Sequence, residues 1–177
     1  TLLSPPTGGR YDLFGGSIVG GTISGNTLST TTSGGTLNGV TFTGNLNLPA
    51  NTNSGLAGTS SFAGGSAPFG TNSYLYLNNT GAALTFDATS TASGEVRVIA
   101  SGVTGTALTN QGTFTHTVGT GDLYARMFTN SGNVTASAGT LNFGSTTAGY
   151  DSANSGTVIA TGAGTLVAIA GNVTNTG

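Results

Sequence analysis

The stretch Leu108-Thr-Asn110-Gln-Gly112-Thr-Phe114 carries the pattern that decides the fold: an apolar residue, Asn two positions later, then Gly, then another apolar residue. The same pattern returns towards the C-terminus, at Phe128-Thr-Asn130-Ser-Gly132-Asn-Val134, Asn154-Ser-Gly156-Thr-Val158 and Asn175-Thr-Gly177. Successive glycines of the pattern are 20, 24 and 21 residues apart. A period of this length indicates one supersecondary unit per repeat, with the units stacked into a solenoid.

The recurring Asn and Gly residues predict the corners of the coils. A solenoid coil needs several corners, and Gly and Asn enter left-handed backbone conformations at a lower energetic cost than other residues. Asn side chains stacked at one corner can also hydrogen-bond to one another along the axis. We therefore expect structural corners at Asn110, Gly112, Asn130, Gly132, Asn154, Gly156, Asn175 and Gly177, with the four asparagines forming a ladder.

Composition narrows the class of protein. Only 5% of the 177 residues are charged, and the net charge is −2, so the regularly spaced apolar residues favour an ordered chain over a disordered one. Abundant Thr, Val, Phe and Tyr between Gly and Asn residues predict an all-β fold. The chain has no cysteine and one histidine, so we expect neither a metal site nor a cofactor. Three arginines are too few for a phosphate-binding stripe, which argues against nucleic acid as a partner, and no apolar run is long enough for a transmembrane helix.

Four segments follow one another along the chain. Residues 1–13 contain Pro5 and Pro6 and predict an extended lead-in. Residues 14–48 contain two groups in which a small residue followed by an apolar one returns every five positions, which is typical of short strands with a corner after each. The apolar residues are Ile18, Ile23 and Leu28 in the first group and Leu37 and Phe42 in the second. Residues 49–73 lose this rhythm and are predicted to be a loop or linker. Residues 74–177 are predicted to form regular parallel β-helix coils.

The coils of the last segment resemble a known group of proteins. The phrases Gly132-Asn-Val-Thr-Ala-Ser-Ala-Gly139-Thr-Leu-Asn-Phe143 and Gly162-Ala-Gly164-Thr-Leu-Val look like the right-handed parallel β-helices of large secreted bacterial surface proteins. The nearest groups are the filamentous-haemagglutinin-like and autotransporter passenger adhesins, and the resemblance covers about Tyr74 to Gly177. It implies a right-handed parallel β-helix of roughly 20–24 residues per coil and a secreted, cell-surface, non-enzymatic role in structure or adhesion. The implied partners are further repeats or copies of the chain and host-cell or surface glycans.

Three alternative functions remain open at this point. An extracellular filament subunit would join copies by strand exchange or end-to-end β-stacking, with residues 1–13 as the exchanged segment. A phage tail-fibre stalk, which the N-terminal rhythm also resembles, would turn Ile18, Ile23 and Leu28 towards other chains. A polysaccharide-active β-helix enzyme would bring Asp122, His116 and Asp151 together in a groove. The chain has only five acidic residues, so we expect no catalytic site.

Overall fold

The computed structural model of the chain describes residues 9–25, 28–100 and 102–177. These residues form a β-solenoid of about 7 turns of roughly 22 residues each, and they contain no helix. All paired strands are parallel, and each strand pairs with the strand three positions further along the chain. The predicted parallel β-helix is therefore confirmed.

Each coil contributes one strand to each of three faces, which we call sheets 1, 2 and 3. Sheet 1 contains β2 (Ser17–Val19), β5 (Thr36–Asn38), β8 (Asn53–Ala57), β11 (Tyr74–Leu77), β14 (Arg97–Ala100), β17 (Thr120–Tyr124), β20 (Thr140–Gly144) and β23 (Leu166–Ala170). Sheet 2 contains β3 (Thr22–Ile23), β6 (Thr41–Phe42), β9 (Thr59–Phe62), β12 (Ala83–Phe86), β15 (Ala107–Asn110), β18 (Met127–Asn130), β21 (Asp151–Asn154) and β24 (Asn172–Asn175). Sheet 3 contains β1 (Tyr11–Leu13), β4 (Leu28–Thr30), β7 (Leu46–Asn47), β10 (Ser66–Phe69), β13 (Thr91–Gly94), β16 (Thr113–His116), β19 (Asn133–Ala136) and β22 (Thr157–Ala160), with isolated bridges joining β7 to β10.

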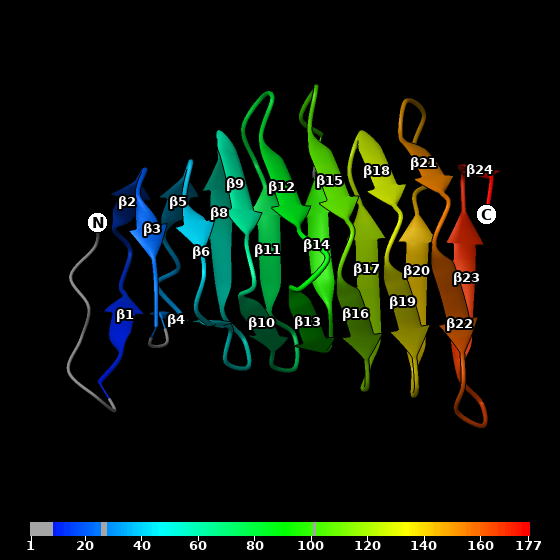
Figure 1. Cartoon of the computed structure of the whole chain (residues 1–177), viewed down its shortest axis with the longest axis horizontal. Helices are drawn as coiled ribbons and strands as arrows, with labels where there is room; N and C mark the ends of the chain where they lie inside the picture. The colour runs from blue at the N-terminus through cyan, green and yellow to red at the C-terminus, as the bar shows by residue number, and fades with distance from the viewer. Residues whose placement is uncertain (1–8, 26–27, 101) are drawn as a thin grey trace.

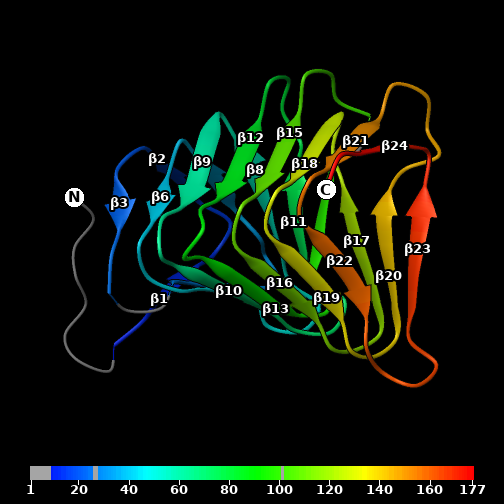
Figure 2. The same cartoon turned by 45° about the vertical axis from the view of Figure 1, so that its right-hand side comes forward.

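The coil is right-handed. In Figure 1 the strands of sheet 1 point upward at the back, the strands of sheet 2 point downward in front, and the chain advances from left to right. Figure 2 confirms the depth order, because β17 and β20 of sheet 1 move to the right of β18 and β21 when the molecule is turned. This is the handedness that the resemblance implies.

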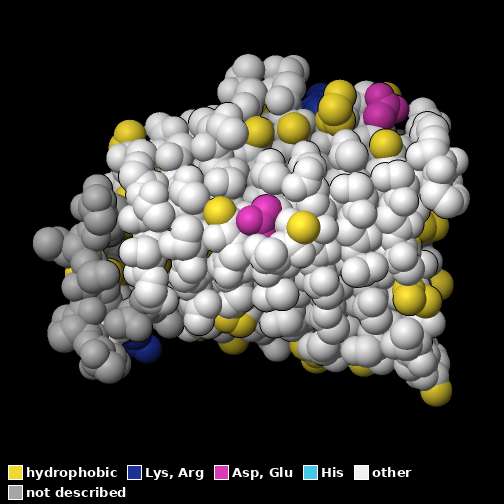
Figure 3. All heavy atoms as spheres, viewed as in Figure 1, with side chains coloured by type: hydrophobic (Ala, Val, Ile, Leu, Met, Phe, Trp, Pro, Cys, Tyr) yellow, Lys and Arg dark blue, Asp and Glu magenta, His cyan; other side chains and the backbone are white. Residues whose placement is uncertain are grey.

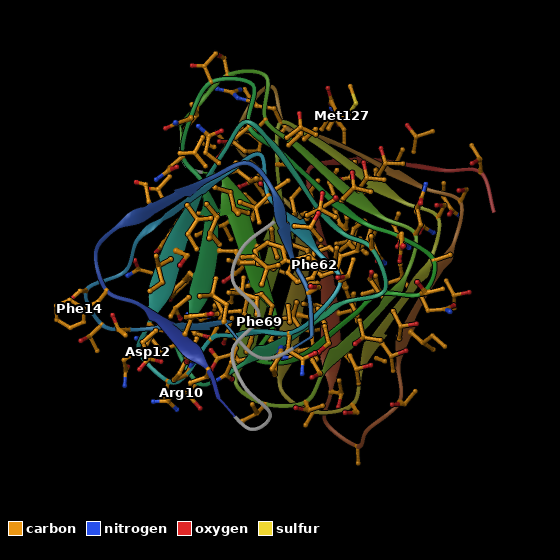
Figure 4. All side chains as sticks on the ribbon, turned by 60° about the vertical axis from the view of Figure 1, so that its left-hand side comes forward. Arg10, Asp12, Phe14, Phe62, Phe69 and Met127 are labelled. Atoms are coloured by element: carbon orange, nitrogen blue, oxygen red, sulfur yellow. The ribbon has the colours of Figure 1, made fainter. Side chains whose placement is uncertain are left out.

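The core is a thin column of inward side chains that runs along the axis. Most strands alternate between inward, buried residues and outward, partly exposed ones, as a half-buried strand must. The largest side chains stack from coil to coil: the rings of Phe42 and Phe62 lie 4.7 Å apart, and those of Phe62 and Phe86 lie 4.4 Å apart. Viewed from the N-terminal side, Phe62 lies inside the ring of sheets, whereas Phe14 and Met127 point outward (Figure 4). The hydrophobic column therefore joins neighbouring coils into one body.

The N-terminal third belongs to the same solenoid. Ile18, Ile23 and Leu28 lie on three different strands, one in each sheet, so the five-residue rhythm does place a corner after each short strand. Ile23 and Leu28 are buried in the chain's own core, and Ile18 packs against it. The phage-fibre expectation that these residues face other chains is therefore wrong for Ile23 and Leu28.

Two segment predictions need correction. Residues 49–73 are not a loop or linker, because they include β8, β9 and β10 and so make a complete coil. Of the predicted lead-in, residues 1–8 lie outside the described residues, and Tyr11–Leu13 is strand β1, paired with β4. A coil needs only one or two inward apolar residues per face, and here Leu56 and Phe62 supply two of them within a glycine-rich stretch.

Candidate functional site

The four recurring asparagines form a continuous ladder at the corner between sheets 2 and 3. The Nδ2 of Asn110 donates to the Oδ1 of Asn130 at 2.7 Å, Asn130 donates to Asn154 at 2.7 Å, and Asn154 donates to Asn175 at 2.8 Å. At the start of the ladder, the Oδ1 of Asn110 accepts a hydrogen bond from the backbone N–H of Gly112 at 3.1 Å. Asn110 and Asn130 are fully buried, whereas Asn154 is half-buried and Asn175 is exposed, so the ladder is a structural element that begins in the core and reaches the surface at its last residue.

The ladder occupies the place that aromatic rings occupy in earlier coils. Strand register aligns Phe62 with Phe86, Phe86 with Asn110, and Asn110 with Asn130. The same inward position thus changes from stacked phenylalanines to hydrogen-bonded asparagines at the fifth coil from the N-terminus. In both arrangements identical side chains lie next to one another in register. The phenylalanines interact by ring stacking, and the asparagines interact by hydrogen bonds between their amide groups.

The glycines that accompany the ladder serve a different purpose from the one predicted. None of Gly112, Gly132, Gly156 and Gly177 has a left-handed backbone. Each instead packs directly on the backbone of the coil before it: a Cβ on Gly132 would lie 2.2 Å from the carbonyl oxygen of Gly112, and one on Gly156 would lie 2.1 Å from that of Gly132. Gly is needed here because no side chain fits between the stacked corners.

A charged cluster lies at the corner between sheets 3 and 1. The carboxylate of Glu95 is almost fully buried and pairs with Arg97, and it also accepts hydrogen bonds from the backbone N–H of Asn72 at 3.0 Å and of Thr120 at 3.4 Å. Asp122 lies 3.7 Å from the Nε of Arg97 and accepts a hydrogen bond from the Asn142 side chain at 2.8 Å. Glu95 thereby connects the coil before it to the coil after it, so the hydrogen bonds and ion pairs of this cluster hold three successive coils together.

His116 is packed in the interior next to this cluster. The imidazole is completely buried, its Nε2 lies 3.3 Å from the carbonyl oxygen of Gly119, and its Nδ1 has no hydrogen-bond partner among the described residues. Burial lowers the pKa of His116 below its ordinary value, although the nearby carboxylates of Glu95 and Asp122 oppose this shift. A neutral imidazole enclosed in the core is an element of packing.

The three residues of the hydrolase hypothesis do not converge. His116 points inward from β16 in sheet 3, and Asp122 lies on the outer side of β17 in sheet 1. Asp151 is exposed at the start of β21 in sheet 2, between Met127 and Asn172 in the strand register. The groove that this hypothesis requires is therefore not formed by these residues.

The outer side of sheet 1 carries aromatic and charged side chains, which are rare in this chain. Tyr76, Ile99 and Tyr124 follow one another in register on three successive strands. Beside them, the guanidinium of Arg97 lies 4.7 Å above the ring of Tyr74 and is hydrogen-bonded to its hydroxyl. On the face drawn in Figure 3, most of the surface consists of backbone and of side chains that are neither hydrophobic nor charged, with only scattered apolar and acidic ones. We call this outer side of sheet 1 the tyrosine face, and its aromatic rings and guanidinium group are of the kinds that can pack against a ligand.

Among the described residues, no three His, Cys, Asp or Glu side chains lie close enough together to hold a metal ion. The same part of the chain has no helix with the length and apolar character needed to cross a membrane. No protein-family model matches the chain, and neither the curated proteins nor the solved structures contain a significantly similar protein.

Proposed function

We propose that the chain is a non-enzymatic structural and adhesive segment of a large secreted surface protein, of the kind its repeat style resembles. The observation that carries this proposal is the continuity of the stack: one hydrophobic column and one asparagine ladder run through successive coils. Such a column gives a stiff spacer, because each coil is held by its neighbours on both sides. The tyrosine face supplies the adhesive part of the proposal.

Adhesion can be measured with the chain displayed on a non-adherent bacterial cell. We expect displaying cells to be retained under flow on a surface coated with polysaccharide, and cells without the chain to be washed away. The variant Phe62→Asp places a charge in the ring stack and serves as the matched unfolded control, at the same display level. Equal retention of the wild type and this variant would contradict an adhesive role for the folded rod.

A second function is favoured by apolar side chains that are exposed on the last described strands. A hollow of about 540 Å³ lies beside them, and the apolar residues Phe143, Val158 and Val173 line it together with the polar residues Asn154 and Asn175. Ile169 lines the same hollow and is 58% exposed. These apolar side chains are suited to pack against another copy of the chain, and such packing would give a self-assembling filament.

Electron microscopy of the purified chain shows whether copies of the chain assemble into filaments or remain single rods. Regular fibres that disappear in the variant Ile169→Asp would support a filament subunit, and the variant Val118→Asp is the control because Val118 is exposed in the middle of the solenoid. Single short rods at all concentrations would exclude self-assembly of this chain.

A further inference from the structure

A contact of Tyr150, near the tyrosine face, joins coils that are not adjacent in the solenoid. The hydroxyl of Tyr150 donates to the carbonyl oxygen of Ala100 at 3.1 Å and accepts from the backbone N–H of Gly102 at 3.1 Å. These partners lie 50 and 48 residues away, which is two coils, whereas solenoid residues ordinarily contact adjacent coils. The loop that carries Tyr150 therefore folds back along the axis to build a local structure that the repeat does not require.

That structure holds Arg126 in a fixed position. Its guanidinium lies 4.6 Å above the ring of Tyr150, its Nε donates to the carbonyl oxygen of Val103 at 3.3 Å, and its Nη1 donates to that of Ala148 at 3.0 Å. Gly149 has a left-handed backbone, and a Cβ at this position would lie 2.5 Å from the Nη1 of Arg126. The loop is thus shaped around the guanidinium.

Arg126 differs from the other two arginines in its electrostatic partners. Arg10 pairs with Asp12, and Arg97 pairs with Glu95 and Asp122. All five acidic residues of the chain are described, and none of them forms an ion pair with Arg126. The structure therefore presents a positioned cation whose charge is not neutralised by a carboxylate of the chain.

The guanidinium borders a cavity of about 180 Å³ with hydroxyl groups on its walls. Tyr124, Ser145, Thr147 and Tyr150 line this cavity together with Arg126. Burial, aided by the Asp122 carboxylate, raises the pKa of Tyr124 above its ordinary value, which already lies well above neutral pH, and the protonated hydroxyl can donate a hydrogen bond. Pockets that enclose a whole drug-sized ligand measure about 300–1,000 Å³, so this smaller cavity is suited to one end group of a longer ligand.

We propose that this cavity binds the carboxylate-bearing ring of an acidic polysaccharide, a uronic acid, with Arg126 holding the carboxylate and the hydroxyl-lined wall holding the ring hydroxyls. Planar guanidinium groups bind carboxylates through two parallel N–H bonds, and hydroxyl-bearing side chains match the donors and acceptors of a sugar. Tyr124 borders the cavity and also ends the row of Tyr76 and Ile99, so the neighbouring sugar rings lie along the tyrosine face. This inference rests on the proposed adhesive function and specifies its ligand.

Binding is tested with a galacturonic acid oligomer, with a neutral galactose oligomer of equal length as its comparison, by isothermal titration calorimetry. We expect the acidic oligomer to bind and Arg126→Gln to weaken it about tenfold to a hundredfold, the effect of losing hydrogen bonds to a charged group. Arg10→Gln removes an equal charge from a residue outside the cavity and should leave binding unchanged. Thr147→Asp adds a carboxylate beside Arg126 on an exposed loop position and should abolish binding. This variant tests the site independently of Arg126→Gln, whose folding could be disturbed.

Three results would overturn the inference. The first is equal affinity for the neutral oligomer. The second is unchanged binding by both Arg126→Gln and Thr147→Asp. The third is acetate binding as tightly as the oligomer, which would indicate a carboxylate site without a saccharide. If no acidic oligomer binds while displayed cells are still retained under flow, the uronic acid assignment fails and the adhesive function stands. If the oligomer binds but displayed cells are not retained, the uronic acid site stands and the adhesive function fails.

Discussion

Asn130 is the position at which the asparagine ladder can be tested most directly. Replacing it with Ala removes the two 2.7 Å bonds to Asn110 and Asn154. The Nδ2 of Asn110 then keeps only a 3.4 Å contact with the Asn133 carbonyl oxygen, and the Oδ1 of Asn154 loses its donor. Each buried polar group left without a partner costs about 1–3 kcal/mol, and water can reach the half-buried Asn154, so we expect a total loss of about 3 kcal/mol.

This loss is measured as the free energy of unfolding in urea, followed by far-UV circular dichroism. For a chain of this length, about 3 kcal/mol corresponds to a decrease in melting temperature of roughly 6–12 °C. The matched control is Asn175→Ala, because Asn175 is exposed and makes a single ladder bond, so its loss should stay below about 1 kcal/mol. A loss below about 1 kcal/mol for Asn130→Ala, or equal losses for both variants, would refute the view that the ladder stabilises the stack.

Four further changes have defined outcomes. Gly132→Ala forces a Cβ to within 2.2 Å of the Gly112 carbonyl oxygen, so it should destabilise the chain by more than about 2 kcal/mol in urea, whereas Gly16→Ala, which meets no neighbour and has no left-handed backbone, should cost less. Phe62→Ala removes a fully buried ring from the stack and should lower the free energy of unfolding by about 3–5 kcal/mol in the same assay. Because the pKa of His116 is lowered from 6.5 in the folded chain, the unfolded chain takes up a proton first as the pH falls, so stability should decrease below about pH 6.5 by at most about 1.4 kcal/mol per unit. His116→Gln should remove that slope, and an unchanged slope would contradict it. Hydrogen bonds from Ser90, Thr89 and Gly64 hold the pKa of Asp87 at about 2, so Asp87→Asn should destabilise the chain at neutral pH and lose its effect as the pH falls from about 4 towards 2, which acid titration of both proteins would reveal.

The coils with a strong residue rhythm could be predicted, and the reasons are local. Ile18, Ile23 and Leu28 mark one strand each because a short strand in a narrow coil turns one apolar side chain inward. The ladder corners could be placed because Asn and Gly recur together. The physical role of the glycines could not be predicted, since close approach between coils depends on residues some 20 positions away.

The sequence of residues 49–73 predicts a loop although the segment forms a coil, because its glycines pack against other coils. A Cβ on Gly55 would lie 2.5 Å from the Asn78 side chain, and one on Gly58 would lie 2.5 Å from that of Asn38. These are contacts across coils, which a single stretch of sequence does not reveal.

The cavity beside Arg126 also escaped prediction. Tyr150 reaches Ala100 and Gly102 across two coils, and no periodic pattern encodes a contact that skips a repeat. The signal present in the sequence was modest: a lone aromatic residue follows a run of Gly, Ser, Thr and Ala in residues 144–149, and an arginine stands two positions after Tyr124.

The change from Phe86 to Asn110 at one inward position gives the two halves of the rod different responses to temperature. Ring stacking in the N-terminal half relies on apolar burial, which weakens on cooling and has a large heat-capacity signature. The amide ladder in the C-terminal half buries polar groups, which contribute to the heat capacity with the opposite sign. Cooling should therefore weaken the contacts at this inward position more in the phenylalanine coils than in the asparagine coils, while the rest of the apolar column, which includes Phe128 and Phe143, is shared by both.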